Sequence, residues 1–532
     1  AERGASVVNG YYQYSRSDSR FTVIDFPRLD HMYRALDAVI DPGTGAIVCR
    51  STLSFPADGC VPANMFGPGA PSPAAIDYIL EGDMWRDSMV EQHFAELSAQ
   101  TELERGITGS PMMVAGGVSF RRERFDQAPG PADLVALQTH PAAQEGYRGL
   151  PSSFVSAGIL QFAGVGETPI GGHFDVGEVF AETLVPLVRD RPLINAMDFN
   201  AAARYAHYSG SGGVFAWKAG LDWRVNDSVR FRVTRSRDTR AATLSERFDV
   251  AGSGATAYDP VLDATYSFST ISGGNPAVAP ELGDTWTLGM VLQPATLPNL
   301  GLSIDWYDVR ISDYITVLGI QRLINECYAG AQELCDRIER NPVSGNITWV
   351  QNLYLNLAAA RVRGLDVEFT WQHALSLFGT GNESIRLRIL SSLLDENSFT
   401  NVSTATRDDA GTTSLPRWTA TGMLAYRNGP FELALTGRYI ADRVQFRAPI
   451  APSDQLDDNG VDSVFYTNLR LGYEFDLGDY GRHSLFFNVA NLFDVDPPVV
   501  ANWSDFFGAS AFPPGLHDTL GRRFTLGLEF EF

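Results

Sequence analysis

The stretch GRRFTLGLEFEF, residues 521–532, alternates strictly between apolar and polar side chains. The apolar positions are Phe524, Leu526, Leu528, Phe530 and Phe532, and the positions between them are Thr525, Gly527, Glu529 and Glu531. A period of two indicates a β-strand with one apolar and one polar side. A soluble sandwich buries the apolar side of such a strand in a core, whereas a membrane barrel turns it toward lipid. The stretch alone does not choose between these two classes.

Composition narrows the choice. The chain has 532 residues, with 41 Lys and Arg against 63 Asp and Glu, which gives a net charge of −22. A nucleic-acid-binding protein presents a basic face, so we expect no nucleic-acid partner. No run of about twenty apolar residues occurs, and the sequence therefore predicts no transmembrane helix.

Arginine supplies nearly all the positive charge, because Lys218 is the only lysine. A GC-rich genome explains this bias most simply. A second explanation is functional, since the forked guanidinium group suits carboxylates and phosphates on lipopolysaccharide or on a substrate.

The four cysteines form two pairs that are close in sequence, Cys49 with Cys60 and Cys327 with Cys335. Each pair lies in a long polar segment between predicted strands. A zinc site would need four ligands at tighter spacing with histidine nearby, so no metal site is expected. The spacing predicts two local disulfides in an oxidising compartment, and the alternative is four free thiols in a cytosolic protein.

Period-two alternation recurs along most of the chain. No helical heptads and no alternation of strands with helices interrupt it, apart from a short helix expected near 320–339. We therefore predict an all-β protein with about sixteen strands. The predicted strands cover residues 6–24, 86–103, 111–127, 173–189, 194–209, 213–225, 228–238, 284–294, 300–315, 353–373, 384–397, 417–428, 430–442, 463–477, 483–494 and 522–532.

The connections between these strands alternate in length. Short turns such as RVNDSV, PATLPN, RNGP and LGDYGRH alternate with long segments, and SGSGG is the one short connection on the long side. The long segments are 25–85, 128–172, 239–283, 316–352, 398–416, 443–462 and 495–521. A transmembrane barrel sorts its connections in this way, because its periplasmic turns are short and its outer loops are long. The sequence therefore predicts an antiparallel β-barrel in the bacterial outer membrane.

The strand at 521–532 fits this prediction. Leu526 and Leu528 are expected to face lipid, and Thr525 and Glu529 the lumen. Barrels of this membrane present a terminal aromatic strand to the assembly machinery. We expect that signal to consist of Phe524, Phe530 and Phe532.

Several motifs resemble those of the TonB-dependent receptors, which are active transporters of the Gram-negative outer membrane. Residues 491–494 (NLFD), Pro497-Pro498 and Gly521-Arg522 resemble the last hairpin of the family. GNPAVAPELGDTWTLGM at 274–290 is similar to its N-P-x-L-x-P-E segment, with Val278 where leucine is usual. RDTRAATLSERF at 237–248 resembles its R-A-P-x-x-x-E-L-F stretch, with Ala242 and Arg247 replacing proline and leucine. The cysteine-bearing segments 60–79 and 335–369 are similar to a branch common in alphaproteobacteria.

These motifs are interpreted as structural. The side chains of Asn491 and Asp494 are expected to bond to the backbone and to start a turn. Gly364 and Gly527 lie inside predicted strands, where the missing side chain allows close packing in the lumen.

The resemblance implies energised import. A ligand such as a siderophore or an oligosaccharide would bind the outer loops, and a plug in the lumen would move when the TonB-ExbB-ExbD complex pulls on it. Lipopolysaccharide and outer-membrane lipid would surround the barrel, and no cofactor is implied. In the last outer loop, the candidate ligand contacts are Trp503, Phe506, Phe507 and His517. The alternative is that these side chains belong to the interfacial belt or pack the loop itself.

No enzyme motif was found, since the sequence has no H-E-x-x-H, no G-x-S-x-G and no P-loop lysine. We therefore expect no catalytic residues. The acidic stretch SDQLDDNGVD at 453–462 is better explained as a solvated loop than as a calcium site. Two other functions stay open: a passive porin-like channel, which about sixteen strands would suit, and a structural or adhesive protein.

The family barrel has twenty-two strands and an N-terminal plug. Because about sixteen strands are predicted here and no plug-like region precedes them, we expect residues 1–532 to be the barrel portion of a longer receptor. The plug and the first strands would then be absent, and the strand at 6–24 would have an open edge. The alternative is a sixteen-strand barrel closed by its first and last predicted strands.

Overall fold

A computed structural model describes residues 6–25, 27–104, 109–130, 169–378, 382–401, 406–445, 447, 458–478, 481–500 and 516–530. Its main feature is one sheet of 17 strands, of which β18 (Arg407–Asp408) has only two residues. The long strands are β1 (Val7–Val23), β4 (Met84–Leu103), β5 (Met112–Pro129), β6 (Ile170–Arg191), β7 (Ile194–Tyr208), β8 (Gly212–Arg224), β9 (Val229–Arg240), β12 (Glu281–Leu292), β13 (Leu300–Thr316), β16 (Leu355–Leu375), β17 (Glu383–Asn401), β19 (Trp418–Asn428), β20 (Phe431–Ile440), β23 (Val464–Asp476), β24 (Arg482–Ala490) and β25 (Arg523–Phe530). The predicted all-β architecture with about sixteen strands is confirmed. No helix in the described ranges has the length and apolarity needed to cross a membrane.

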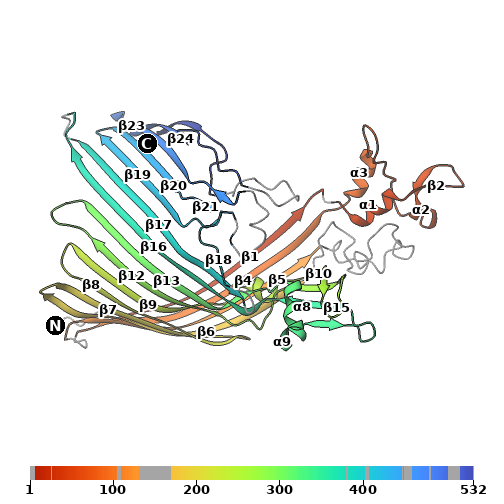
Figure 1. Ribbon diagram of the computed structural model, residues 1–532, viewed down its shortest axis with the longest axis horizontal. Coiled ribbons are helices and arrows are strands. Elements are labelled where there is room, and N and C mark those ends of the chain that lie inside the picture. Colours follow the sequence, from red (N-terminus) through yellow and green to blue (C-terminus); the bar gives the residue numbers. More distant parts are fainter. Residues whose placement is uncertain are drawn as a thin grey trace.

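The long strands form a meander. Each pairs antiparallel with the next long strand along the chain, from the β1–β4 ladder to the β24–β25 ladder. The sheet is strongly curved (Figure 1). Within the described residues no ladder joins β1 to β25, so each of these two strands has one open edge.

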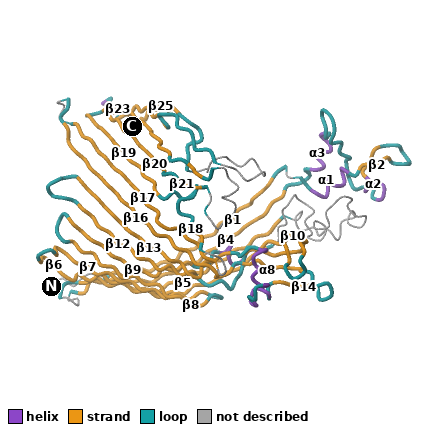
Figure 2. The backbone as a smooth tube through the Cα atoms, in the orientation of Figure 1, coloured by secondary structure: helices purple, strands orange, loops and turns teal. Residues whose placement is uncertain are grey.

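Short and long connections lie at opposite ends of the sheet, as the sequence predicted. Short turns join β8 to β9, β12 to β13 and β19 to β20, and they lie on the left in Figure 1. The long connections gather at the opposite end, and the labelled helices, in purple in Figure 2, lie in these connections. The sheet thus has a turn end and a loop end, which are expected to be the periplasmic and the outer end.

The first long connection folds into a small unit that stands apart from the sheet (Figure 1). It contains α1 (Leu29–Leu36), β2 (Ala38–Ile40), β3 (Ile47–Cys49), α2 (Arg50–Ser54) and α3 (Pro73–Ile79). The predicted Cys49–Cys60 disulfide is present in it. His31 of α1 stacks on Tyr78 of α3 with ring centroids 4.2 Å apart. Because the unit is too small for a large core, the disulfide and this stack replace part of one.

Two further long connections combine into a second unit. One supplies α7 (Leu244–Phe248), β10 (Val250–Asp259) and β11 (Ala264–Gly273), and the other supplies α8 (Ile320–Tyr328), α9 (Gln332–Cys335), β14 (Ile338–Arg340) and β15 (Ile347–Leu353). The four strands form one sheet in the order β10-β11-β15-β14, with β11 and β15 parallel. Leu323 and Ile324 of α8 pack with Val350 in its core. The predicted Cys327–Cys335 disulfide joins α8 to α9.

The chain has little helix, as predicted, and its described helices are all short. The helix expected near 320–339 is present as α8 and α9, but four other short helices, α1, α2, α3 and α7, lie in segments that were predicted to be plain loops. Each is short, and its stability comes from tertiary contacts more than from local propensity.

Candidate functional site

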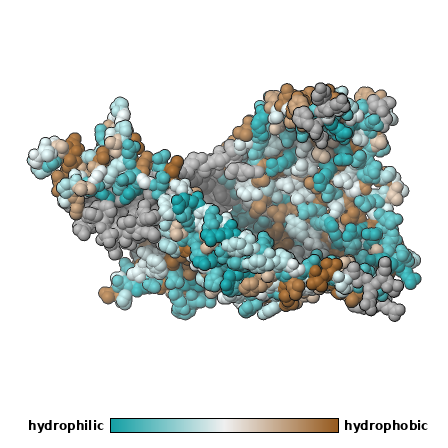
Figure 3. Space-filling model, turned by 180° about the vertical axis from the view of Figure 1, so that it is seen from behind, coloured by the Kyte–Doolittle hydropathy of each residue, from teal (hydrophilic) through white to brown (hydrophobic). Residues whose placement is uncertain are grey.

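The two faces of the sheet differ in polarity. In the last hairpin Leu526 pairs with Phe487 on one side, and Thr525 pairs with Asn488 on the other. Leu526 is 72% exposed although it is apolar, as expected for a side chain in contact with lipid. The alternation predicted from the sequence is therefore maintained across the ladder. Figure 3 shows the hollowed side of the molecule, with polar residues in teal along its walls.

Two glycines allow aromatic rings to lie flat against the inner wall. A Cβ atom at Gly527 would overlap the ring of Phe486, and one at Gly364 would overlap the Tyr307 hydroxyl. Both glycines were predicted to permit close packing in the lumen, and both contacts agree with that prediction.

Arginine–carboxylate pairs cross between strands on the inner wall. Arg232 of β9 reaches Asp305 of β13 through two contacts of 2.6 and 2.7 Å. Arg388 of β17 donates to Glu368 of β16 at 2.9 Å. The forked guanidinium can bridge neighbouring strands in this way, which a lysine cannot do with the same geometry. The lumen therefore presents fixed charges of both signs.

A hollow of about 500 Å³, named here the upper wall hollow, lies on the inner face of β4 to β9 near the loop end. Four of its charged side chains come in two pairs: Arg121 lies 3.1 Å from Glu123, and Arg204 lies 3.7 Å from Glu178. The buried Tyr208 adds an aromatic wall. An apolar wall with a few convergent polar groups is typical of a small-molecule site.

The rim above this hollow is held by a network around Arg240. Its guanidinium donates to Glu281 at 2.5 and 2.7 Å, and also to Glu246 at 2.9 and 3.0 Å. Glu246 closes a capping box with Thr243 at the start of α7. Glu281 in turn accepts from the backbone N–H of Ile315 at 2.8 Å. The two motifs at 237–248 and 274–290 are thus structural, as predicted, because they fix the rim.

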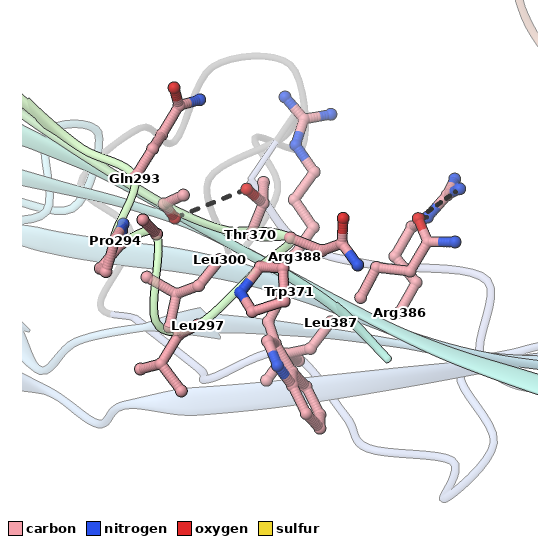
Figure 4. Close-up of a pocket in the computed structure, with 14 residues that line it drawn as sticks. Gln293, Pro294, Leu297, Leu300, Thr370, Trp371, Arg386, Leu387 and Arg388 are labelled. Carbon is pink, nitrogen blue, oxygen red and sulfur yellow. Dashed lines mark hydrogen bonds between the residues drawn. The ribbon is translucent and has the colours of Figure 1, made fainter. Parts of the chain in front are cut away.

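A second hollow, of about 620 Å³, lies at the turn end and is named here the lower wall hollow. Figure 4 shows its side chains: Trp371 and Leu387 leave one side of the sheet, while Thr370 and Arg388 leave the other. The Thr370 hydroxyl donates to the carbonyl of Gly301 at 3.5 Å. The inner wall is therefore polar at both ends.

The NLFD motif starts the last long loop as predicted. Asn491 is fully buried, and its side chain exchanges two 2.9 Å hydrogen bonds with the backbone of Val495. Asp494 accepts from the backbone N–H of Arg522 at 2.8 Å, so it joins the two ends of the loop. Both residues have positive φ, which Asn and Asp tolerate better than most side chains.

His517 is buried near the end of that loop. It is 8% exposed and lies between Arg443, at 2.5 Å from Nε2, and the hydroxyl of Tyr466, at 3.0 Å from Nδ1. A guanidinium only donates, so Nε2 accepts and the ring proton is on Nδ1. Burial, together with the nearby Arg443 and Arg438, lowers the pKa of His517 to about 4. The structure thus places this predicted ligand residue in a loop anchor.

The other sequence candidates are only partly described. Trp503, Phe506, Phe507 and Phe532 lie outside the described residues. Phe524 and Phe530 are on the apolar face of β25, 65% and 52% exposed. Their role in ligand contact or in barrel assembly stays a prediction. Most of the acidic stretch 453–462 also lies outside the described residues, and no cluster of three or more metal-ligating side chains occurs in the rest.

Comparison with known proteins identifies the chain. The family model described as TonB dependent receptor-like, beta-barrel matches residues 10–492. The chain belongs to this family. TonB-dependent receptors are integral outer-membrane transporters and not enzymes. A comparison with curated protein sequences gave no match.

Solved structures of receptor barrels are similar in fold. The pyoverdine outer membrane receptor FpvA from Pseudomonas aeruginosa has a TM-score of 0.51 at 10% identity, over 85% of this chain and 54% of that one. For the siderophore receptor PirA from Acinetobacter baumannii the TM-score is 0.49 at 14% identity, over 77% and 55% of the two chains. For the ferric enterobactin receptor PfeA from Pseudomonas aeruginosa it is 0.47 at 15% identity, over 86% and 64%. This receptor barrel therefore spans about half to two thirds of the length of the structures it matches.

Sequence reasoning missed the upper wall hollow. Its charged residues Arg121, Glu178 and Arg204 lie within predicted strands, at positions that the alternation assigns to the lumen. Charge at inward positions of neighbouring strands could have indicated it. What the sequence does not give is which inward side chains lie at the same height, because that depends on the register between strands.

Proposed function

We propose that this receptor barrel takes up a large or scarce ligand, such as a siderophore or an oligosaccharide, across the outer membrane in a TonB-dependent process. The observation that carries the proposal is the match to the TonB-dependent receptor barrel, combined with a polar, charge-lined inner wall beneath folded outer loops. The TonB-ExbB-ExbD complex would supply the energy.

The two hollows suit two different contacts. The upper wall hollow lies at the loop end, where a ligand arriving from outside would first meet the inner wall. Its guanidinium and carboxylate groups and its aromatic wall offer forked hydrogen bonds and stacking area. The lower wall hollow, with Gln293, Gln372 and Arg386, presents polar groups to the lumen at the turn end, where a plug would pack.

The open edges of β1 and β25 support a larger barrel. An unpaired strand edge in lipid leaves N–H and C=O groups without partners, which costs several kcal/mol for each group. We infer that further strands pair with both edges in the complete receptor, and that its lumen holds a plug.

A passive channel is the second candidate, because sixteen long strands are also a porin-like number. Growth of a deletion strain should be compared across iron-limited and carbohydrate media, with and without TonB. Loss of uptake in both deletions supports the proposal. Liposome swelling separates the two candidates, since a passive channel admits small sugars and a plugged receptor excludes them. Swelling with small sugars, or uptake that persists without TonB, would contradict TonB-dependent transport.

A further inference from the structure

A pocket of about 670 Å³ lies among the outer loops that follow β17 and β20. We name it the loop-base pocket. Three of its lining residues are arginines, Arg417, Arg443 and Arg447. Its lining residue Arg443 bonds to His517, which contacts the hydroxyl of Tyr466, a side chain that packs with Ile440 on the inner face of the sheet. The pocket therefore opens on the lumen side of the rim and not on the lipid side.

Arg443 is a buried cation without a carboxylate partner. Only 4% of it is exposed, and it donates to the carbonyls of Thr413 and Ala441 at 3.2 Å each and to His517 at 2.5 Å. In the part of the chain that the structure describes, no carboxylate forms an ion pair with it. Burial of a charge is costly unless an opposite charge compensates it.

The other two arginines share a single carboxylate. Arg417 and Arg447 each lie 3.1 Å from the same oxygen of Asp408. One carboxylate cannot satisfy ten guanidinium N–H groups, so donors of both side chains stay available to the pocket. Asp442 and Asp462 also line the pocket, but they are exposed to solvent and pair with none of the three arginines.

We propose that the loop-base pocket binds an anionic group, a carboxylate or a phosphate, of the ligand that this receptor takes up. The inference rests on the proposed function. A forked guanidinium binds such a group through two parallel hydrogen bonds. An incoming anion would compensate the buried charge of Arg443, while Arg417 and Arg447 would hold it from the exposed side.

A purely structural role for Arg443 does not explain why an arginine occupies this position or why two further arginines line the pocket. The three bonds of Arg443 anchor the loops, but neutral donors such as Gln or Asn could bond to the same carbonyls without the cost of a buried charge. An anchor also gives no reason for two further arginines at the same pocket. The substitutions that discriminate are therefore Arg417→Gln and Arg447→Gln, because these side chains make no bond to the buried anchor.

The test uses the complete receptor in detergent, titrated at low salt with citrate, with inorganic phosphate and with neutral sucrose. We expect calorimetry to show binding of both anions but not of sucrose, with an affinity that falls as salt rises. R417Q and R447Q should each weaken anion binding about tenfold, since each removes a charge-assisted hydrogen bond. The matched control is R407Q, because Arg407 pairs with Asp409 in the same loop and does not line the pocket. Absence of anion binding, or equal weakening by R407Q, would overturn the inference.

A second experiment, on uptake by variant strains, tests whether the anionic group that binds the pocket belongs to the transported ligand. Strains that carry R447Q or R443Q should show reduced TonB-dependent uptake, with hydrogen exchange used to verify that the loops of R447Q remain folded. If the anions bind but uptake by both strains is unchanged, the pocket holds a free ion and the inference fails. If the anions bind but uptake never depends on TonB, the proposed function fails instead.

Discussion

Arg340 of β14 holds the fully buried carboxylate of Asp259 of β10, with Nη1–Oδ2 and Nη2–Oδ1 distances of 2.6 and 2.9 Å. The two residues belong to different outer loops, 81 positions apart in sequence. The Tyr266 hydroxyl donates a further bond of 2.6 Å to the same carboxylate. Since the loop of Asp259 alone would leave a buried charge unpaired, the pair makes the two loops fold as one unit.

Replacement of Asp259 with Asn should loosen this unit and leave the barrel strands intact. Removal of one partner of a buried ion pair costs about 3–5 kcal/mol, because the other charge is left uncompensated. Hydrogen exchange should therefore accelerate in β10, β11, β14 and β15. R407Q is a control, since Arg407 pairs with Asp409 near the surface and such pairs contribute little. Unchanged exchange in D259N would show that the ion pair does not hold the loops together.

The strands of this receptor could be predicted from sequence and its loops could not. Lipid on one side and water on the other impose a period of two on every strand, so the pattern at 522–532 or 463–477 is visible locally. The outer loops obey no such rule. Segment 239–283 forms α7, β10 and β11, but β11 is stabilised by parallel pairing with β15, which lies 80 residues further on. A contact of that kind has no local signature.

In the candidate site, too, local features could be predicted from sequence and contacts between distant residues could not. His517 was singled out from its loop composition, yet its role depends on Arg443, 74 residues away, and on Tyr466 of β23. The three side chains meet because β20 pairs with β23. Arg443 follows β20 closely, Tyr466 lies in β23, and His517 lies near the end of the last loop. The disulfides were predictable since both partners of each pair are close in sequence, with separations of 11 and 8 residues.

Non-reducing peptide mapping of the receptor should recover the Cys49–Cys60 and Cys327–Cys335 links and no others. Loops of this size contribute about 2–3 kcal/mol each in the chain-entropy model. Serine at Cys327 and Cys335 together should therefore increase exchange around α8 and α9, and the unit that contains Cys49 serves as the internal control. Recovery of a link between loops, such as Cys60–Cys327, would contradict the pairing.

Arginine at Leu526 should impair assembly, and arginine at Thr525 should be tolerated. The two residues are neighbours in β25 but lie on the apolar and the polar face. A cation on the lipid face costs about 2–4 kcal/mol near the bilayer midplane, whereas a cation in the lumen stays hydrated. Heat-modifiable mobility on gels reports the folded fraction of each variant. Equal damage from both substitutions would mean that the faces are assigned wrongly.

Acid should release the last outer loop before it disturbs the unit held by Asp259. The pKa of His517 is lowered to about 4, so the folded loop prefers the neutral ring. The unfolded loop, with an ordinary histidine pKa near 6.5, binds more protons between these values, and the anchor loses up to about 3 kcal/mol as pH falls from 6.5 to 4. The bonds from Arg340 lower the pKa of Asp259 to about 2, so its stabilising effect is lost only as pH falls below about 3.8.

Hydrogen exchange at pH 7 and pH 4.5 measures this difference. Protection near His517 should fall at the lower pH, while protection in β10 and β14 should persist. His517→Gln keeps a hydrogen-bonding side chain but cannot titrate, so this variant should show no pH-dependent change in the loop. A similar loss of protection in both loops, or a pH response that persists in H517Q, would argue against histidine as the titrating group.

The open edges of β1 and β25 lead to the last prediction. Each strand has a ladder on one side only in the described residues, with β4 and with β24. If further strands fill the gap, the intact receptor should be clearly heavier than the 58.1 kDa of this chain or should co-purify with a second polypeptide. Cysteines placed at Tyr14 of β1 and Leu526 of β25 should not cross-link, because the added strands hold them apart. Cysteines at Tyr14 and its ladder partner His93 of the neighbouring strand β4 should link readily. A membrane-inserted species near 58 kDa without a partner, or an efficient link between Y14C and L526C, would instead show that β1 and β25 close the barrel directly.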